Sequence, residues 1–201
     1  MGFIIKEIDM IKYLLICFFC LFSINSYAEK VLLIGDSLMG TISESYKKHN
    51  KKDDVKIKYV VGSGLENNKF DWFNYLAKKD LSSFNKVIIS FGTNDFGVHN
   101  KNCYERKIKS FIKLIKEKQS NVKIIWIAPP AVKNKNINDG IIIVRNIIKD
   151  VSNQEKIDFI DVRNILGYDF KTYILGRKIR ENDGIHYTLN AGDMIVSKIP
   201  D

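Results

Sequence analysis

Four short polar clusters in the sequence contain the residue types that acyl transfer at a serine would need. Three of them come directly after short apolar runs, and the fourth precedes the last helical stretch of the chain. The clusters are Gly35-Asp36-Ser37, Gly62-Ser63-Gly64, Gly92-Thr93-Asn94-Asp95 and Asp183-Gly184-Ile185-His186. Together they hold a nucleophile, a base with a carboxylate partner, and several hydrogen-bond donors.

Ser37, Asp183 and His186 form a candidate catalytic triad. Ser37 stands where an apolar run gives way to a helical pattern, a turn that exposes a nucleophile at a helix N-terminus. Asp183 and His186 are three positions apart. At that spacing the carboxylate can accept from one imidazole nitrogen while the other nitrogen faces the serine hydroxyl. The N–H groups of Ser37 and a glycine, with the Asn94 amide, can supply an oxyanion hole.

Strands and helices alternate between these clusters. Short apolar runs predict strands at residues 31–34, 55–61, 87–91, 122–128 and 157–162. Helical periodicity marks residues 38–48, 72–79, 104–115, 137–151 and 190–199. This order predicts an α/β domain, a three-layer α/β/α sandwich with a central parallel five-stranded sheet. In such sheets ligands bind outside the carboxyl ends of the strands, where three of the clusters fall.

The clusters resemble the conserved blocks of the SGNH (GDSL) hydrolase family. Gly35-Asp36-Ser37-Leu38 reads as the GDSL motif, Gly92-Thr93-Asn94-Asp95 matches the third block, and Asp183-Gly184-Ile185-His186 matches the last block. Gly64-Leu65 followed by Phe70-Asp71-Trp72 looks like a small exported subgroup of unknown function. The resemblance covers about Lys30 to Ile199.

The resemblance implies an SGNH/flavodoxin-like fold and a serine esterase. Its catalytic residues would be Ser37, Asp183 and His186, and its oxyanion hole would be Ser37, Gly64 and Asn94. The second block departs from the family, which usually has an Asn shortly before the oxyanion glycine; none stands between Val55 and Gly64. Either Gly62 or Gly64 could donate, and alignment on the residues that follow favours Gly64.

Several residues near the clusters are expected in supporting roles. Asp36 reads as a helix cap or turn stabiliser, and Asp95 as a residue that fixes its loop. The aromatic residues Phe70, Trp72, Phe73 and Tyr75 could equally wall an acyl or sugar pocket or pack in the core. The basic residues Arg177, Lys178 and Arg180 are expected on a solvated loop.

The N-terminus has the pattern of a secretory signal peptide. Lys6 and Lys12 precede an apolar run at residues 13–24, and Ser26-Tyr27-Ala28 has small residues at the positions that a signal peptidase reads. The run has 12 residues, whereas a membrane-spanning helix needs about 20. We expect residues 1–28 to be a signal peptide and residues 29–201 an SGNH hydrolase domain, secreted or periplasmic, with no stable membrane span after cleavage.

Charge and cysteine content narrow the class of partner. The net charge is +9, but the lysines are scattered along the chain, and export argues against nucleic acid as a partner. After cleavage only Cys103 would remain, so no intrachain disulfide is expected. The sequence has no His-Glu-x-x-His run, no cysteine pairs of metal-binding spacing after residue 28, and no Gly-rich phosphate loop, and we expect no cofactor and no metal.

The expected function is hydrolysis of acyl esters, and the preferred substrate is an O-acetyl ester on cell-envelope carbohydrate. A small ester is the other substrate considered. An O-acetyltransferase with the same triad, or a catalytically silent protein that binds envelope polysaccharide, are the alternatives. Oligomeric state is left open.

Overall fold

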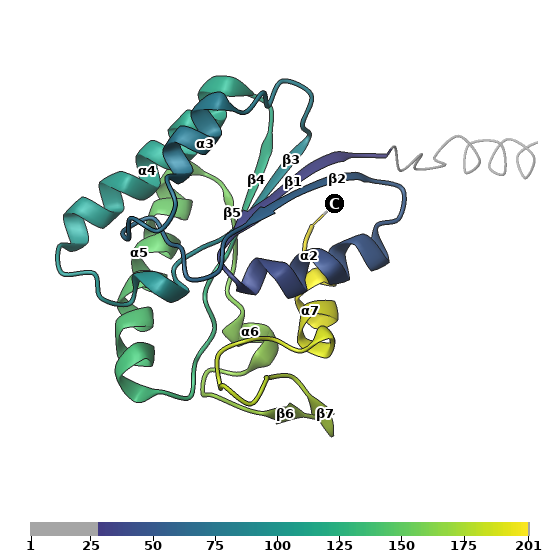
Figure 1. The fold of residues 1–201 in the computed structure, drawn as a ribbon, viewed down its shortest axis with the longest axis vertical. Helices are drawn as coiled ribbons and strands as arrows, with labels where there is room; N and C mark the ends of the chain where they lie inside the picture. The colour runs from purple at the N-terminus through teal and green to yellow at the C-terminus, as the bar shows by residue number, and fades with distance from the viewer. Residues whose placement is uncertain (1–27, 201) are drawn as a thin grey trace, which may run out of the picture.

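The central element of the fold is a five-stranded sheet in which all neighbouring strands are parallel (Figure 1). The computed structural model describes residues 28–200, so the predicted signal peptide lies outside the described residues except for Ala28. The strand order is β2-β1-β3-β4-β5. The strands are β1 (Lys30–Gly35), β2 (Asp54–Tyr59), β3 (Lys86–Ser90), β4 (Lys123–Ile127) and β5 (Asp158–Ile160). The predicted parallel sheet of five strands is confirmed.

Helices cover both faces of this sheet. Successive side chains of a strand point to opposite sides, so a fully buried strand presents apolar side chains to both faces. In β1, Leu32 and Ile34 pack into one core cluster, and Val31 and Leu33 pack into the other. The first cluster lies under α3 (Trp72–Lys78), α4 (Lys101–Lys118) and α5 (Lys135–Glu155). The second lies under α2 (Leu38–His49), α6 (Arg163–Leu166) and α7 (Leu189–Val196). The predicted three-layer sandwich is confirmed.

Helix α4 shows why these segments fold as they do. Five of its apolar residues lie on one helix face and are fully buried, while its lysines are exposed or half-buried. The buried residues are Tyr104, Ile108, Phe111, Ile112 and Ile115. Asn100 caps the helix by accepting a hydrogen bond from the N–H of Cys103 at 3.0 Å.

The chain between β5 and α7 contains elements that the sequence pattern does not predict. Helix α6 has four residues, and β6 (Tyr173–Ile174) and β7 (Arg177–Lys178) form a two-stranded hairpin. The turn residues Leu175 and Gly176 have φ of 47° and 75°, as a tight hairpin turn requires. Strands of two residues are too short to show an alternating pattern, so periodicity misses them.

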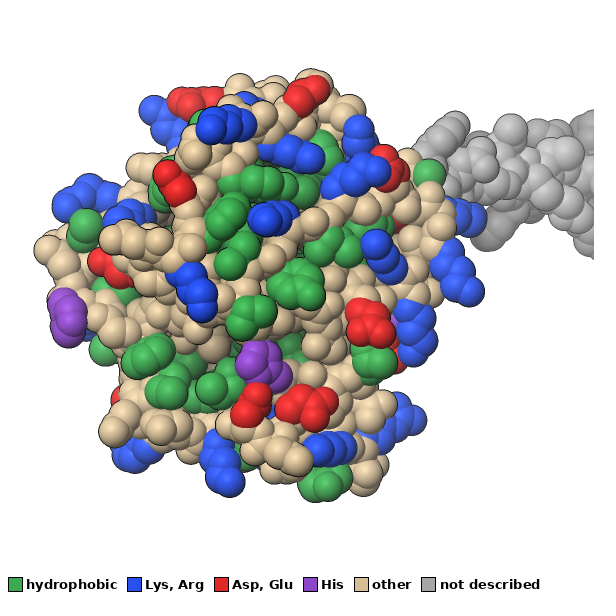
Figure 2. Space-filling model, in the orientation of Figure 1, with side chains coloured by type: hydrophobic (Ala, Val, Ile, Leu, Met, Phe, Trp, Pro, Cys, Tyr) green, Lys and Arg blue, Asp and Glu red, His purple; other side chains and the backbone are tan. Residues whose placement is uncertain are grey.

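The outer surface agrees with the scattered charge of the sequence. Figure 2 shows Lys and Arg side chains spread over the visible face without one dominant patch. Strand β2 is an edge strand of the sheet, with half of its residues exposed. Within residues 28–200, no helix has the length and apolar composition needed to cross a membrane.

Candidate active site

Ser37 lies at the carboxyl end of β1, immediately before α2. Strand β1 is the second strand of the sheet, between β2 and β3, and it ends at Gly35 beside the end of β3. The turn therefore places Ser37 at the N-terminus of α2, where the helix dipole favours negative charge. The hydroxyl of Ser37 lies 2.8 Å from Nε2 of His186, across 149 residues of sequence.

Asp183 accepts three hydrogen bonds within one loop, two of them from His186. Its Oδ2 lies 2.5 Å from Nδ1 of His186. Its Oδ1 accepts from the N–H of Ile185 at 2.8 Å and from the N–H of His186 at 3.0 Å. Partial burial raises the pKa of Asp183, but these bonds and the imidazole outweigh it and lower the pKa to about 2. The carboxylate is therefore ionised at neutral pH, and Nδ1 of His186 carries the proton.

The backbone at Gly184 explains how both side chains can share so short a loop. Gly184 has φ of 73°, and a Cβ there would lie 2.5 Å from Cβ of Lys133. The Gly184 carbonyl also accepts from the N–H of Lys133 at 3.0 Å. A glycine is thus needed both for the turn and for the close approach of the β4–α5 connection.

Arg180 anchors the same loop from inside the protein, which corrects the expectation that it is solvated. It is 2 % exposed. Its guanidinium donates to the carbonyl of Ile185 at 3.2 Å and to the carbonyl of Ala131 at 3.1 Å, and it stacks 4.7 Å from the Tyr187 ring centroid. Nothing in the sequence distinguishes this buried arginine from Arg177, three residues earlier, which is exposed.

The candidate oxyanion donors lie on two loops that bond to each other. Asn94 sits in the short helix η1 (Thr93–Asp95) after β3, and its amide donates to the carbonyl of Ser63 at 2.9 Å. The amide nitrogen has a second hydrogen left for a ligand oxygen. Among the described residues, no backbone partner is found for the N–H of Ser37 or of Gly64.

Gly64 lies against Asp95, which was expected to fix its own loop and instead holds the loop of the second block. A Cβ at Gly64 would collide with the Asp95 carboxylate. That carboxylate accepts from the N–H groups of Leu65 and Glu66 at 3.1 and 3.0 Å, and from the Tyr104 hydroxyl at 2.8 Å. Tyr104, predicted only as an apolar helix residue, thus braces the second block. Gly62 has φ of 74° and lies beside Lys69 instead.

Asp36 is a second buried carboxylate behind Ser37. Its Oδ1 accepts from the N–H of Leu38 at 2.9 Å, which confirms the predicted turn-stabilising role. Its Oδ2 is buried without a hydrogen-bond partner among the described residues. Burial raises the pKa of Asp36 to about 7, and the nearby Asp95 adds to that rise while the Leu38 N–H opposes it.

The four aromatic residues near the second block differ in how deeply they are buried. Trp72 is a core residue at 1 % exposure, and its indole N–H donates to the Ser63 hydroxyl at 3.1 Å. Phe70, Phe73 and Tyr75 are only partly buried.

In the described part of the chain, His, Cys, Asp and Glu form no group of three or more suited to a metal ion.

The structure brings Ser37, Asp183 and His186 into one hydrogen-bonded chain at the carboxyl edge of the sheet. Solved structures share the fold. A lipase/acylhydrolase from Enterococcus faecalis is 20% identical with a TM-score of 0.64, covering 85% of this chain and 94% of its own. A GDSL-like lipase from Bacteroides thetaiotaomicron is 19% identical with a TM-score of 0.59, covering 84% of each chain.

A catalytic mutant of an acetylxylan esterase from Geobacillus stearothermophilus is 15% identical with a TM-score of 0.62. It is matched over 85% of this chain and 92% of its own. No curated protein sequence matches the chain. These structures confirm the predicted likeness to the GDSL/SGNH fold. Residues 30–201 match the family model described as "Protein of unknown function (DUF459)", and the chain belongs to that family.

Proposed function

We propose that the protein is a serine esterase with Ser37, His186 and Asp183 as its catalytic triad. The observation that carries the proposal is the continuous hydrogen-bond chain from Asp183 through His186 to Ser37, with links of 2.5 and 2.8 Å. Those distances let a neutral imidazole take the hydroxyl proton while the carboxylate stabilises the imidazolium that forms.

The reaction has two steps. In the first, Nε2 of His186 takes the Ser37 proton and Oγ attacks the ester carbonyl, whose oxygen is held by the N–H groups of Ser37 and Gly64 and by the Asn94 amide. The imidazolium then protonates the departing alcohol and leaves an acyl-serine. In the second step His186 takes a proton from water, which attacks the acyl-serine and releases the acid and the free Ser37 hydroxyl.

We propose O-acetylated cell-envelope carbohydrate as the substrate and the periplasm or the exterior as the location. The acetylxylan esterase of similar fold supports carbohydrate acetyl esters. The predicted cleavage after Ala28 would leave all of β1, which begins at Lys30, in the mature protein. Strand β1 lies between β2 and β3, so cleavage there is compatible with the sheet.

The test is hydrolysis of p-nitrophenyl acetate by the purified protein beside its Ser37→Ala and Ser110→Ala variants. Ser110 is exposed on α4 and serves as the matched control. We expect Ser37→Ala to lose activity by roughly 10³-fold or more, with folding unchanged, and Ser110→Ala to match the wild type. A folded Ser37→Ala variant with full activity would refute the assignment.

The same assay separates the alternatives. Release of p-nitrophenol that depends on an added sugar acceptor, with the acetyl group recovered on that sugar and not as free acetate, would identify an O-acetyltransferase. Tight binding of acetylated polysaccharide by a folded wild type that releases no p-nitrophenol with or without the acceptor would identify a silent binding protein.

A further inference from the structure

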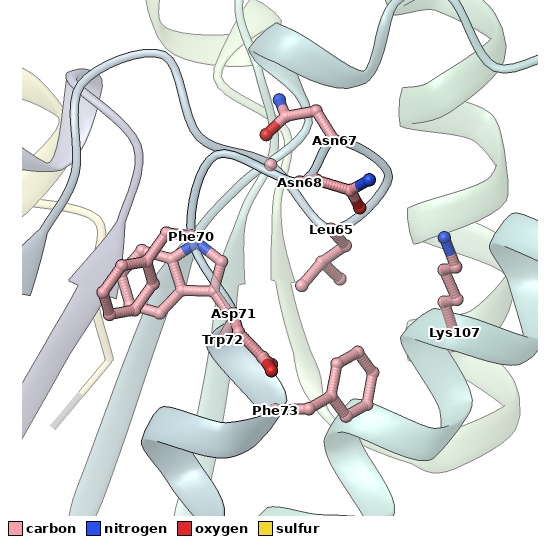
Figure 3. Close-up of a pocket in the computed structure, with 9 residues that line it drawn as sticks. Leu65, Asn67, Asn68, Phe70, Asp71, Trp72, Phe73 and Lys107 are labelled. Atoms are coloured by element: carbon pink, nitrogen blue, oxygen red, sulfur yellow. The ribbon is translucent and has the colours of Figure 1, made fainter.

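A cavity of about 420 Å³ opens beside the candidate oxyanion glycine, Gly64 (Figure 3). It lies between the segment 64–73, which leads into α3, and helix α4, which contributes Lys107. Its volume falls in the range of small-molecule pockets, about 300–1,000 Å³. Gly64 belongs both to the cavity wall and to the second block, so the cavity meets the candidate oxyanion hole at this glycine, whereas Ser37 and His186 do not line it.

The cavity combines apolar and polar walls from two parts of the chain, the segment 64–73 and helix α4. Figure 3 shows Leu65 pointing toward Phe73, with Lys107 rising from α4 on the other side and Asn68 above. Phe73 is held edge-on against the Phe111 ring, with centroids 5.4 Å apart. The wall is therefore rigid on its apolar side.

The polar groups of the wall can both donate and accept hydrogen bonds. Lys107 lines the cavity and pairs with Glu66, which lies outside the cavity lining, at 2.7 Å; both side chains are about one-third exposed. The Asn68 side chain makes no hydrogen bond to the described residues. A ligand with several hydroxyls can bond to the ammonium, the carboxylate and the amide, whereas a long acyl chain would leave these groups unpaired.

We propose that this cavity binds a sugar unit on the alcohol side of the scissile ester. A sugar has apolar C–H faces that can contact Leu65 and Phe73, and hydroxyls that can bond to Asn68 and the Lys107–Glu66 pair. This inference rests on the proposed esterase function and extends it, because it makes the leaving alcohol, not the acyl group, the part of the substrate that the enzyme selects.

Binding to the inactive Ser37→Ala protein tests the cavity separately from turnover. The probe is an O-acetylated xylo-oligosaccharide, with its Kd measured by calorimetry. Asn68→Ala and Lys107→Met, each in the Ser37→Ala background, should raise the Kd several-fold, and together about tenfold, since each removes one or two hydrogen bonds. Asn68→Ala breaks no hydrogen bond to the described residues, so a raised Kd would report on the lost ligand contact.

The matched controls are Asn74→Ala on α3 and Lys109→Met on α4. Neither residue lines the cavity, although each lies on a helix that borders it. Both should leave the Kd unchanged. No measurable binding by the Ser37→Ala protein, or the same Kd in all cavity variants, would overturn the inference.

A turnover assay of otherwise wild-type protein distinguishes this failure from failure of the esterase proposal. If p-nitrophenyl acetate is hydrolysed but the oligosaccharide does not bind, the esterase proposal stands and the cavity inference falls. If the oligosaccharide binds and the cavity variants weaken it while no ester is hydrolysed, the cavity is a sugar site, but the esterase proposal falls and with it the assignment of the cavity to the alcohol side of an ester.

Discussion

At Asp183 one carboxylate serves three donors at once, and this determines what His186 can do. Two of the donors are backbone N–H groups of the same loop, at 2.8 and 3.0 Å, and the third is the imidazole. The two backbone bonds orient the carboxylate independently of the imidazole ring. The ring thus has its proton on Nδ1 and offers a free lone pair on Nε2 toward Ser37.

Asp183→Asn should abolish most activity with little effect on folding. The amide oxygen can still accept from the backbone, but its NH₂ would face Nδ1 and move the imidazole proton to Nε2, where it cannot take the serine proton. We expect kcat for p-nitrophenyl acetate to fall roughly 10²–10⁴-fold with Tm nearly unchanged. An Asp183→Asn enzyme with wild-type kcat would show that the carboxylate has no part in catalysis.

Asp36 predicts a particular dependence of stability on pH. Its folded pKa of about 7 lies above the ordinary value of 3.8, so the folded state binds a proton more tightly than the unfolded state. Stability from this group is therefore present at low pH and is lost as pH rises from about 4 to 7. Asp36→Asn should reduce that loss, measured as the difference in urea midpoint between pH 5 and pH 8. An equal difference in both proteins would refute this reading of Asp36.

At the scale of elements, the loop that carries Asp183 and His186 is held mainly by hydrogen bonds from the buried Arg180. Arg180 joins the loop to the β4–α5 connection through the carbonyls of Ile185 and Ala131. The N–H of Glu181 donates to the carbonyl of His186 at 2.9 Å, which closes the loop on itself. These hydrogen bonds thus position His186 relative to Ser37.

Arg180→Met should misplace His186 while keeping much of the apolar packing. Both carbonyls would lose their buried donor, at a cost of about 1–3 kcal/mol each. We expect kcat to fall at least about tenfold with a smaller change in KM, and Arg180→Lys, which restores one donor, to recover part of kcat. Arg177→Met, at an exposed site in the hairpin, is the control. A loss of Tm in Arg180→Met with unchanged kcat would show that Arg180 only stabilises the fold.

At the scale of the whole molecule, one buried lysine ties the two ends of the described chain to the sheet. Lys86 begins β3, and its side chain is 4% exposed. Its Nζ lies 2.6 Å from the Glu29 carboxylate and donates to the carbonyl of Pro200 at 3.2 Å. Glu29 is also the first residue after the predicted cleavage site, so this contact would remain in the mature protein.

Lys86→Met should lower the free energy of unfolding by about 2 kcal/mol, since a charge-assisted hydrogen bond is lost and Glu29 keeps its charge near an apolar group. Urea unfolding measures the change. Lys51→Met, at an exposed lysine after α2, should leave stability within about 0.5 kcal/mol. Equal midpoints for Lys86→Met and Lys51→Met would show that the contact between the ends is not a stabilising one.

The sequence by itself determined the layers of the sheet and the residues gathered at its carboxyl edge. Local pattern carries that information: the apolar runs of β1 and β3 are short and end at glycine or polar clusters, which favours buried strands, and the spacing in α4 is that of one helix face. The polar clusters then follow from the rule that parallel strands end at one edge. Elements of two to four residues, such as β6, β7 and α6, have no period and were not predictable.

Only the tertiary structure decided which of the neighbouring polar residues support the site. Arg180 and Arg177 look alike in the sequence, yet one is buried under His186 and the other is exposed. Tyr104 reads as an apolar helix residue until its hydroxyl meets Asp95. Burial and hydrogen bonding depend on segments far apart in the chain, and local pattern holds no record of those segments.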